Sequence, residues 1–165
     1  MKKILVIQTA FIGDVVLATS LIENLHQQFP EVKIDILVRN GNESLFQSHP
    51  FLNQVLVWDK KNNKYQNWVG LLFKIRSRQY DVVLNAQRFA ATGAWTAFSK
   101  AKIKIGFDKN PFSFLFTHSV LHQFSEKGQH EIDRNHQLLS SLFVTKVAMP
   151  KLYPTAADEI AVSSY

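Results

Sequence analysis

The chain has 165 residues, of which 46% are hydrophobic and 19% are charged, and it contains no cysteine. This length and composition fit one globular domain of ordinary size and exclude a disordered chain. The lack of cysteine excludes disulfides, thiolate nucleophiles and thiolate metal sites, and it fits a cytoplasmic protein.

The formal net charge of +6 favours an acidic partner. Lys and Arg residues are dispersed along the chain, without the basic arm or stacking motif typical of nucleic-acid-binding proteins. We therefore expect an acidic, phosphate-bearing ligand at a membrane surface and no nucleic acid. No apolar run reaches the ~18 residues of a membrane span. The apolar N-terminal segment does not predict export, because Asp14 interrupts it and a helical pattern follows directly.

Strand-like and helix-like patterns alternate along the chain. The predicted strands are Ile4–Gln8, Lys33–Val38, Val55–Trp58, Asp81–Asn85, Lys102–Phe107 and Thr117–His122. The predicted helical segments are Val15–Gln28, Glu43–Ser48, Tyr65–Arg78, Thr92–Ser99 and Glu131–Phe143. This order predicts an α/β domain over residues 1–150, with a Rossmann-like, mostly parallel sheet of five to seven strands and helices on both faces. The proline-containing residues 151–165 resemble the start of a linker.

The loop after the first strand carries one glycine and one acid, Gly13 and Asp14. Ligands of open α/β sheets bind outside the carboxyl ends of the strands, where this loop lies. The loop lacks the glycine spacing of a dinucleotide site and there is no Walker lysine, so a phosphate cradle is not expected here. Two interpretations of Asp14 remain open: it caps the helix, or it is an ionised catalytic base.

Gln87 and Arg88 follow a buried strand and should reach the same carboxyl edge as Asp14. The arginine either grips a carboxylate or phosphate, or is a solvated loop residue. Gly106 is expected to serve backbone geometry or close packing.

His130, Glu131 and His136 do not form a metal site, because the histidines are six residues apart and a helical zinc site needs a spacing of four. His130 either contacts an acceptor or only begins the helix, and Arg134 either does the same or forms a surface ion pair. The aromatic residues between Phe107 and Phe116 favour packing over a flap. His118 and His122 are expected to share one face of the following strand, as cross-strand neighbours.

An ordered series of motifs over residues 1–154 resembles glycosyltransferase family 9, the heptosyltransferase-like enzymes. The motifs are the Gly13-Asp14 loop, His49-Pro50-Phe51-Leu52-Asn53-Gln54-Val55, the strand that ends Asn85-Ala86-Gln87-Arg88, the strand that closes with Gly106-Phe107, and the His-x-x-x-Arg helix start at His130 and Arg134.

The resemblance implies the N-terminal half of a two-domain GT-B glycosyltransferase at the cytoplasmic face, with possible peripheral contact to the inner membrane. Asp14 would be the catalytic base of an inverting transfer, and Gly13, Gln87, Arg88, His130 and Arg134 would bind an acidic saccharide or glycolipid acceptor of the lipopolysaccharide core. No cofactor or metal is implied. The nucleotide-sugar donor, expected to be ADP-heptose, would bind mainly a C-terminal domain absent from these residues. The alternative is a stand-alone, non-catalytic module that binds an acidic sugar or a partner protein.

Overall fold

The computed structural model describes residues 1–122, 131–144, 146–155, 158, 160 and 162. Its strands are β1 (Lys3–Ile7), β2 (Lys33–Arg39), β3 (Leu52–Trp58), β4 (Val82–Asn85), β5 (Ile103–Phe107) and β6 (His118–Val120). Its α-helices are α1 (Ile12–Gln28), α2 (Lys64–Arg78), α3 (Ala90–Phe98) and α4 (Glu131–Gln137), with 3₁₀ turns at Glu43–Phe46, Ser113–Leu115 and Leu138–Ser141.

The six strands form one sheet in the order β3-β2-β1-β4-β5-β6, and every neighbouring pair is parallel. This is the strand order of the Rossmann fold. The parallel α/β fold predicted from the sequence is confirmed. The order also places β1 and β4 side by side, so the chain winds outward in opposite directions from this pair.

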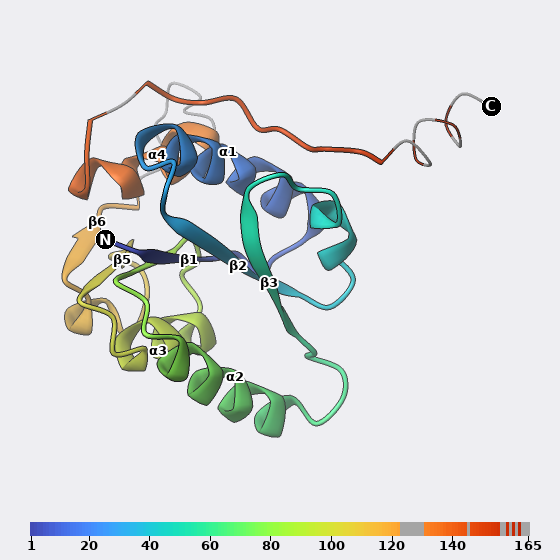
Figure 1. The fold of residues 1–165 in the computed structure, drawn as a ribbon. Coiled ribbons are helices and arrows are strands. Elements are labelled where there is room, and N and C mark those ends of the chain that lie inside the picture. The colour runs from blue at the N-terminus through green and yellow to red at the C-terminus, as the bar shows by residue number, and fades with distance from the viewer. Residues whose placement is uncertain (123–130, 145, 156–157, 159, 161, 163–165) are drawn as a thin grey trace.

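Helices cover both faces of the sheet, with α1 and α4 on one side and α2 and α3 on the other (Figure 1). Alternate residues of β1 serve the two cores: Ile4 and Val6 pack in the cluster that contains Leu21 of α1. Leu5 and Ile7 pack in the cluster that contains Trp95 of α3. Successive side chains of a strand point to opposite faces, and both faces of β1 are buried. This explains why residues 4–7 are all apolar.

The last helical pattern is interrupted in the structure. The sequence predicts one helix over Glu131–Phe143, but the α-helix ends at Gln137 and continues as the 3₁₀ turn Leu138–Ser141. Leu138 and Leu139 are fully buried against the sheet. Burial of these two adjacent leucines is compatible with the tighter turn, in which side-chain spacing differs from that of an α-helix. The predicted strand Thr117–His122 is likewise shorter, at His118–Val120.

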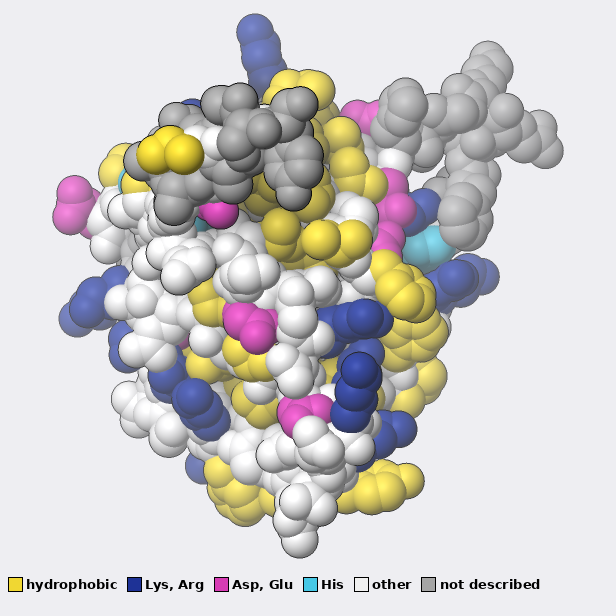
Figure 2. Space-filling view, turned by 90° about the vertical axis from the view of Figure 1, so that its right-hand side faces the viewer, with side chains coloured by type: hydrophobic (Ala, Val, Ile, Leu, Met, Phe, Trp, Pro, Cys, Tyr) yellow, Lys and Arg dark blue, Asp and Glu magenta, His cyan; other side chains and the backbone are white. Residues whose placement is uncertain are grey.

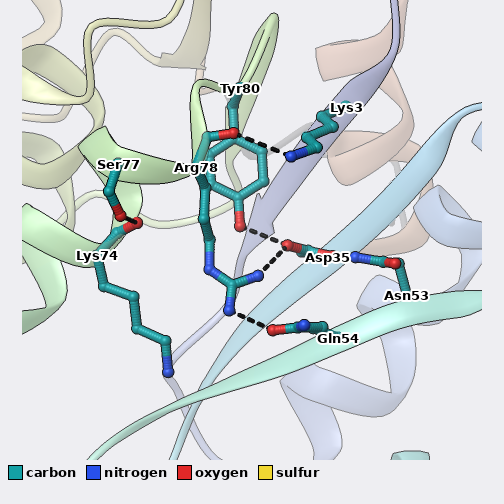
Figure 3. A network of polar contacts seen from close by, with 8 residues as sticks. All are labelled: Lys3, Asp35, Asn53, Gln54, Lys74, Ser77, Arg78 and Tyr80. Atoms are coloured by element: carbon teal, nitrogen blue, oxygen red, sulfur yellow. Dashed lines mark hydrogen bonds and ion pairs between the residues drawn. The ribbon is translucent and has the colours of Figure 1, made fainter.

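A polar network joins β2 and β3 to the end of α2 (Figure 3). Asp35 of β2 is buried and accepts hydrogen bonds from Tyr80 Oη at 2.5 Å and Arg78 Nη1 at 3.1 Å. Asn53 Nδ2 donates to the other carboxylate oxygen of Asp35 at 2.7 Å, and Arg78 also donates to Gln54. Burial and the Asp35 carboxylate raise the pKa of the Tyr80 hydroxyl well above its ordinary value, so Tyr80 remains a donor. The network satisfies a buried charge and fixes α2 on the sheet.

Gly106 of β5 serves close packing, because a Cβ there would lie 2.5 Å from the Phe116 ring. In the part of the chain that the structure describes, each helix is too short or too polar to cross a bilayer.

Candidate functional site

A cleft of about 480 Å³ lies at the carboxyl edge of the sheet. Its walls come from the segments that follow the strands and from α4. The lining residues are Gln8, Thr9, Ala10, Phe11, Asp14, Arg39, Lys60, Ala86, Gln87, Arg88, Phe89, Phe107, His122, Glu131 and Arg134. The structure therefore brings together four residues that the sequence singles out, Asp14, Gln87, Arg88 and Arg134.

Of the two other predicted site residues, Gly13 does not line the cleft. Gly13 lies in the first turn of α1 and is exposed, and a Cβ there would meet no atom within 4 Å. Its smallness is therefore not required by packing in this structure. His130 lies outside the described residues.

Asp14 begins α1 and is half-buried at the cleft. Its Oδ2 accepts a hydrogen bond from the Phe11 backbone N–H at 3.2 Å, which is a helix-capping contact. Its Oδ1 has no hydrogen bond to any residue that the structure describes. The two interpretations of Asp14 are thus compatible, since one oxygen stabilises the helix start and the other faces no competing partner.

Gln87 is buried and held by the first loop, because Thr9 Oγ1 donates to its Oε1 at 2.8 Å. This contact leaves the Gln87 amide nitrogen to donate elsewhere in the cleft. The next residue, Arg88, is exposed at the rim. Asn110 holds the segment 87–89, because its Nδ2 donates to the backbone carbonyls of Gln87 at 3.3 Å and Phe89 at 3.0 Å.

Two cations that the sequence analysis missed complete the cleft. Arg39 ends β2 and lies over the Phe11 ring, with its Cζ 4.9 Å from the ring centroid. Lys60 follows β3, and its Nζ lies 4.5 Å from the centroid of the buried Trp58 ring and donates to the Thr9 carbonyl at 3.0 Å. For Arg39 the signal that could have found it is a polar residue at the end of a buried parallel strand, as for Gln87 and Arg88. Lys60 follows the partly exposed edge strand β3, so that signal does not apply to it.

The cleft is lined by more cationic side chains than carboxylates. The cations are Arg39, Lys60, Arg88 and Arg134, and the carboxylates are Asp14 and Glu131. Burial, followed by the nearby charges of Arg39 and Lys64, lowers the pKa of Lys60. Burial, followed by the charge of Arg134, also lowers the pKa of His122, which lies past the end of β6 and not on the strand where it was expected. Arg134 pairs with Glu131 at 3.1 Å within α4. Such a cleft is suited to a ligand with phosphate or carboxylate groups.

A larger open hollow, of about 840 Å³, lies at the opposite edge and is lined by Lys2, Lys3, Phe73, Arg76, Ser77, Arg78, Gln79, Tyr80, Asp81, Lys100 and Lys102. The carboxyl-edge cleft is the better candidate site despite its smaller size, because ligands of open parallel sheets bind at that edge beside the point where the winding reverses. Figure 2 shows, for the face that it displays, Lys and Arg side chains in separate groups among other residues.

Comparisons with known proteins agree with this fold. The model of glycosyltransferase family 9 (heptosyltransferase) matches residues 68–162. Lipopolysaccharide heptosyltransferase 3 of Escherichia coli is 25% identical over 154 residues, which cover 89% of this chain and 45% of that protein. The chain thus spans less than half the length of this relative.

Solved structures share the fold at low sequence identity. A glycosyl transferase of family 9 from Veillonella parvula superposes with a TM-score of 0.82 at 22% identity, covering 98% of this chain and 47% of the other. Heptosyltransferase WaaC of E. coli, solved with ADP-2-deoxy-2-fluoro heptose, gives a TM-score of 0.72 at 21% identity, covering 87% and 49%. Because the family model covers more than half of the chain and family structures have the same fold, this chain belongs to glycosyltransferase family 9, the heptosyltransferase family.

Proposed function

We propose that residues 1–150 form the acceptor-binding domain of an inverting glycosyltransferase that moves heptose from ADP-heptose to an acidic acceptor of the lipopolysaccharide core. Residues 151–165 would begin the linker to a domain that holds most of the donor. The observation that carries this proposal is the meeting of Asp14 with four cationic side chains in one carboxyl-edge cleft, those of Arg39, Lys60, Arg88 and Arg134.

The cationic side chains of the cleft would bind the acidic groups of the acceptor. Arg39 and Arg88 offer planar, multidentate donors, whereas Lys60 offers a point charge with N–H groups beyond the one used on Thr9. Phosphates or sugar carboxylates placed among them would form charge-assisted hydrogen bonds. The acceptor hydroxyl would then lie next to Asp14, which is the negative group of the first loop.

The chemical step needs a base on the acceptor side. Asp14 Oδ1 would remove the proton of the acceptor hydroxyl as that oxygen attacks the anomeric carbon of the donor. The bond between the anomeric carbon and the diphosphate oxygen breaks, and ADP leaves with the bonding electron pair. Attack from the face opposite the leaving group inverts the anomeric centre. Basic groups and helix dipoles near the diphosphate would stabilise the departing charge.

An acceptor of the lipopolysaccharide core would place this protein at the cytoplasmic face of the inner membrane, in peripheral contact with it. The dispersal of Lys and Arg along the sequence supports local contacts with anionic groups over a continuous nucleic-acid track.

The test is release of ADP when the full-length protein is mixed with ADP-heptose and a lipopolysaccharide-core acceptor. We expect release that depends on the acceptor and yields a heptosylated product by mass spectrometry. Saturable acceptor binding with no release of ADP would contradict the proposal and favour a non-catalytic binding module.

A further inference from the structure

The loop that precedes Asp14, residues 8–11, is held mainly by contacts from other loops. Two consecutive carbonyls of this loop accept hydrogen bonds from side chains that follow two other strands. Asn42 Nδ2, beyond β2, donates to the Ala10 carbonyl at 3.1 Å. Lys60 Nζ, beyond β3, donates to the Thr9 carbonyl at 3.0 Å. A third contact comes from Gln87, which follows β4 and whose Oε1 accepts a hydrogen bond from Thr9 Oγ1 at 2.8 Å.

Asn42 itself is well placed to act as a fixed support. It is 5% exposed, its N–H donates to the Arg39 carbonyl at 3.2 Å, and its own carbonyl accepts from Leu45 at the start of a 3₁₀ turn. Both backbone polar groups of Asn42 are therefore hydrogen-bonded, which fixes the position from which its side chain extends. Unlike Lys60, it does not line the cleft, so its effect on an acceptor must pass through the loop.

Loss of the Asn42 contact would leave the Ala10 carbonyl without this partner and let the loop shift. Phe11 is the next residue, and its N–H bonds the Asp14 carboxylate. A change in the Ala10–Phe11 peptide therefore moves the carboxylate directly. Catalytic geometry is sensitive to such movements, since a displacement of about 1 Å can cost on the order of a hundredfold in rate.

We infer that Asn42 is a positioning residue for the transfer reaction: through the Ala10 carbonyl it sets the place of Asp14 relative to the acceptor hydroxyl. This inference rests on the proposed function. It assigns to Asn42 an effect on the chemical step and none on recognition of the acceptor.

The test compares Asn42→Ala with the matched control Asn40→Ala in the full-length protein, because Asn40 is a nearby exposed asparagine. Hydrogen–deuterium exchange of peptides covering residues 8–14 should rise about tenfold in Asn42→Ala. In the transfer assay its kcat should fall about tenfold, with the acceptor KM within a factor of two. Asn40→Ala should match the wild type in both measurements. Asn42→Asp, which removes the amide donor but keeps the size of the side chain, provides a second variant if Asn42→Ala does not fold; it should likewise raise exchange and lower kcat.

Unchanged exchange in the folded variants would overturn the inference, and so would faster exchange with an unchanged kcat, which would make the contact structural only. The proposed function has a separate failure: if Asp14→Asn transfers heptose at the wild-type rate, Asp14 is not the base. In that case the exchange data still report whether Asn42 holds the loop, but the positioning role falls with the base.

Discussion

At the scale of single residues, the cleft depends on side chains that each do more than one thing. Asp14 caps α1 through Oδ2, and its Oδ1 has no hydrogen bond to any residue that the structure describes. Lys60 stacks on Trp58, bonds the Thr9 carbonyl and adds positive charge. Dual use of this kind explains why the residue pattern alone leaves both capping and catalysis open for Asp14.

Arg88→Ala should weaken binding of an acidic acceptor. Arg88 is exposed, so its contribution is screened, and we expect a loss of about 1 kcal/mol, roughly fivefold in affinity at low salt. Titration calorimetry at two salt concentrations measures this, and the difference from the wild type should shrink at the higher concentration. Lys100→Ala, at the opposite edge of the sheet, is the control. An equal loss in both variants would mean that only net charge matters.

Gly93→Ala should destabilise the domain, because its Cβ would lie 1.9 Å from Oδ1 of the buried Asn110. Asn110 would have to move and release the carbonyls of Gln87 and Phe89. We expect a cost of about 1–3 kcal/mol in the free energy of unfolding, measured with urea. The matched change Gly70→Ala, in α2 with no atom within 4 Å of the new Cβ, should instead stabilise by up to ~1 kcal/mol. Equal effects at the two sites would contradict the role of Asn110.

At the scale of elements, the segment 150–155 crosses back over α1 and packs on an aromatic cluster. Tyr153 Oη donates to Glu23 Oε1 at 3.0 Å, and the Lys151 N–H donates to Thr19 Oγ1 at 2.9 Å. The His49 ring lies 4.8 Å from the Tyr153 ring and 4.5 Å from the Phe51 ring. Burial, and to a lesser extent the charge of His26, lowers the pKa of His49 from 6.5 to about 4.

The lowered pKa of His49 makes the free energy of unfolding sensitive to acid. Between pH 6.5 and 4 the unfolded chain takes up a proton at His49 while the folded chain does not, so the free energy of unfolding falls as pH falls through this window. His49→Leu removes that proton uptake. The stability of the wild type relative to His49→Leu should therefore drop by about 2 kcal/mol from pH 7 to pH 4.5, measured by urea unfolding. Parallel losses in the two proteins would contradict this account.

The sequence predicts the order and type of most elements, because strands such as β4 are mostly apolar and the apolar residues of helices such as α2 have helical spacing. It does not predict the 3₁₀ turn at Leu138–Ser141, where burial against the sheet sets the backbone. It finds Gln87 and Arg88 because they directly follow a buried strand. It misses the supports Asn42 and Asn110, because their partners lie on loops far away in the chain.

At the scale of the whole molecule, the strand order explains where the cleft lies. The winding reverses between β1 and β4, so the segments after these two strands diverge and leave a crevice between them. Asp14 follows β1, and Gln87 and Arg88 follow β4, which brings them to one place from opposite parts of the chain. The fold thus places a carboxylate and four cationic side chains in one cleft, the arrangement that we propose for an acidic acceptor.

The central claim is that Asp14 acts as the base of this cleft, and kinetics of Asp14→Asn in the full-length protein test it most directly. The matched control is Asp133→Asn, which changes an acid in the first turn of α4 that does not line the cleft. We expect transfer by Asp14→Asn to fall by about 10²–10⁴-fold, with acceptor affinity and unfolding free energy nearly unchanged, and Asp133→Asn to match the wild type. Transfer by Asp14→Asn within a factor of a few of the wild type would show that Asp14 is only a helix cap.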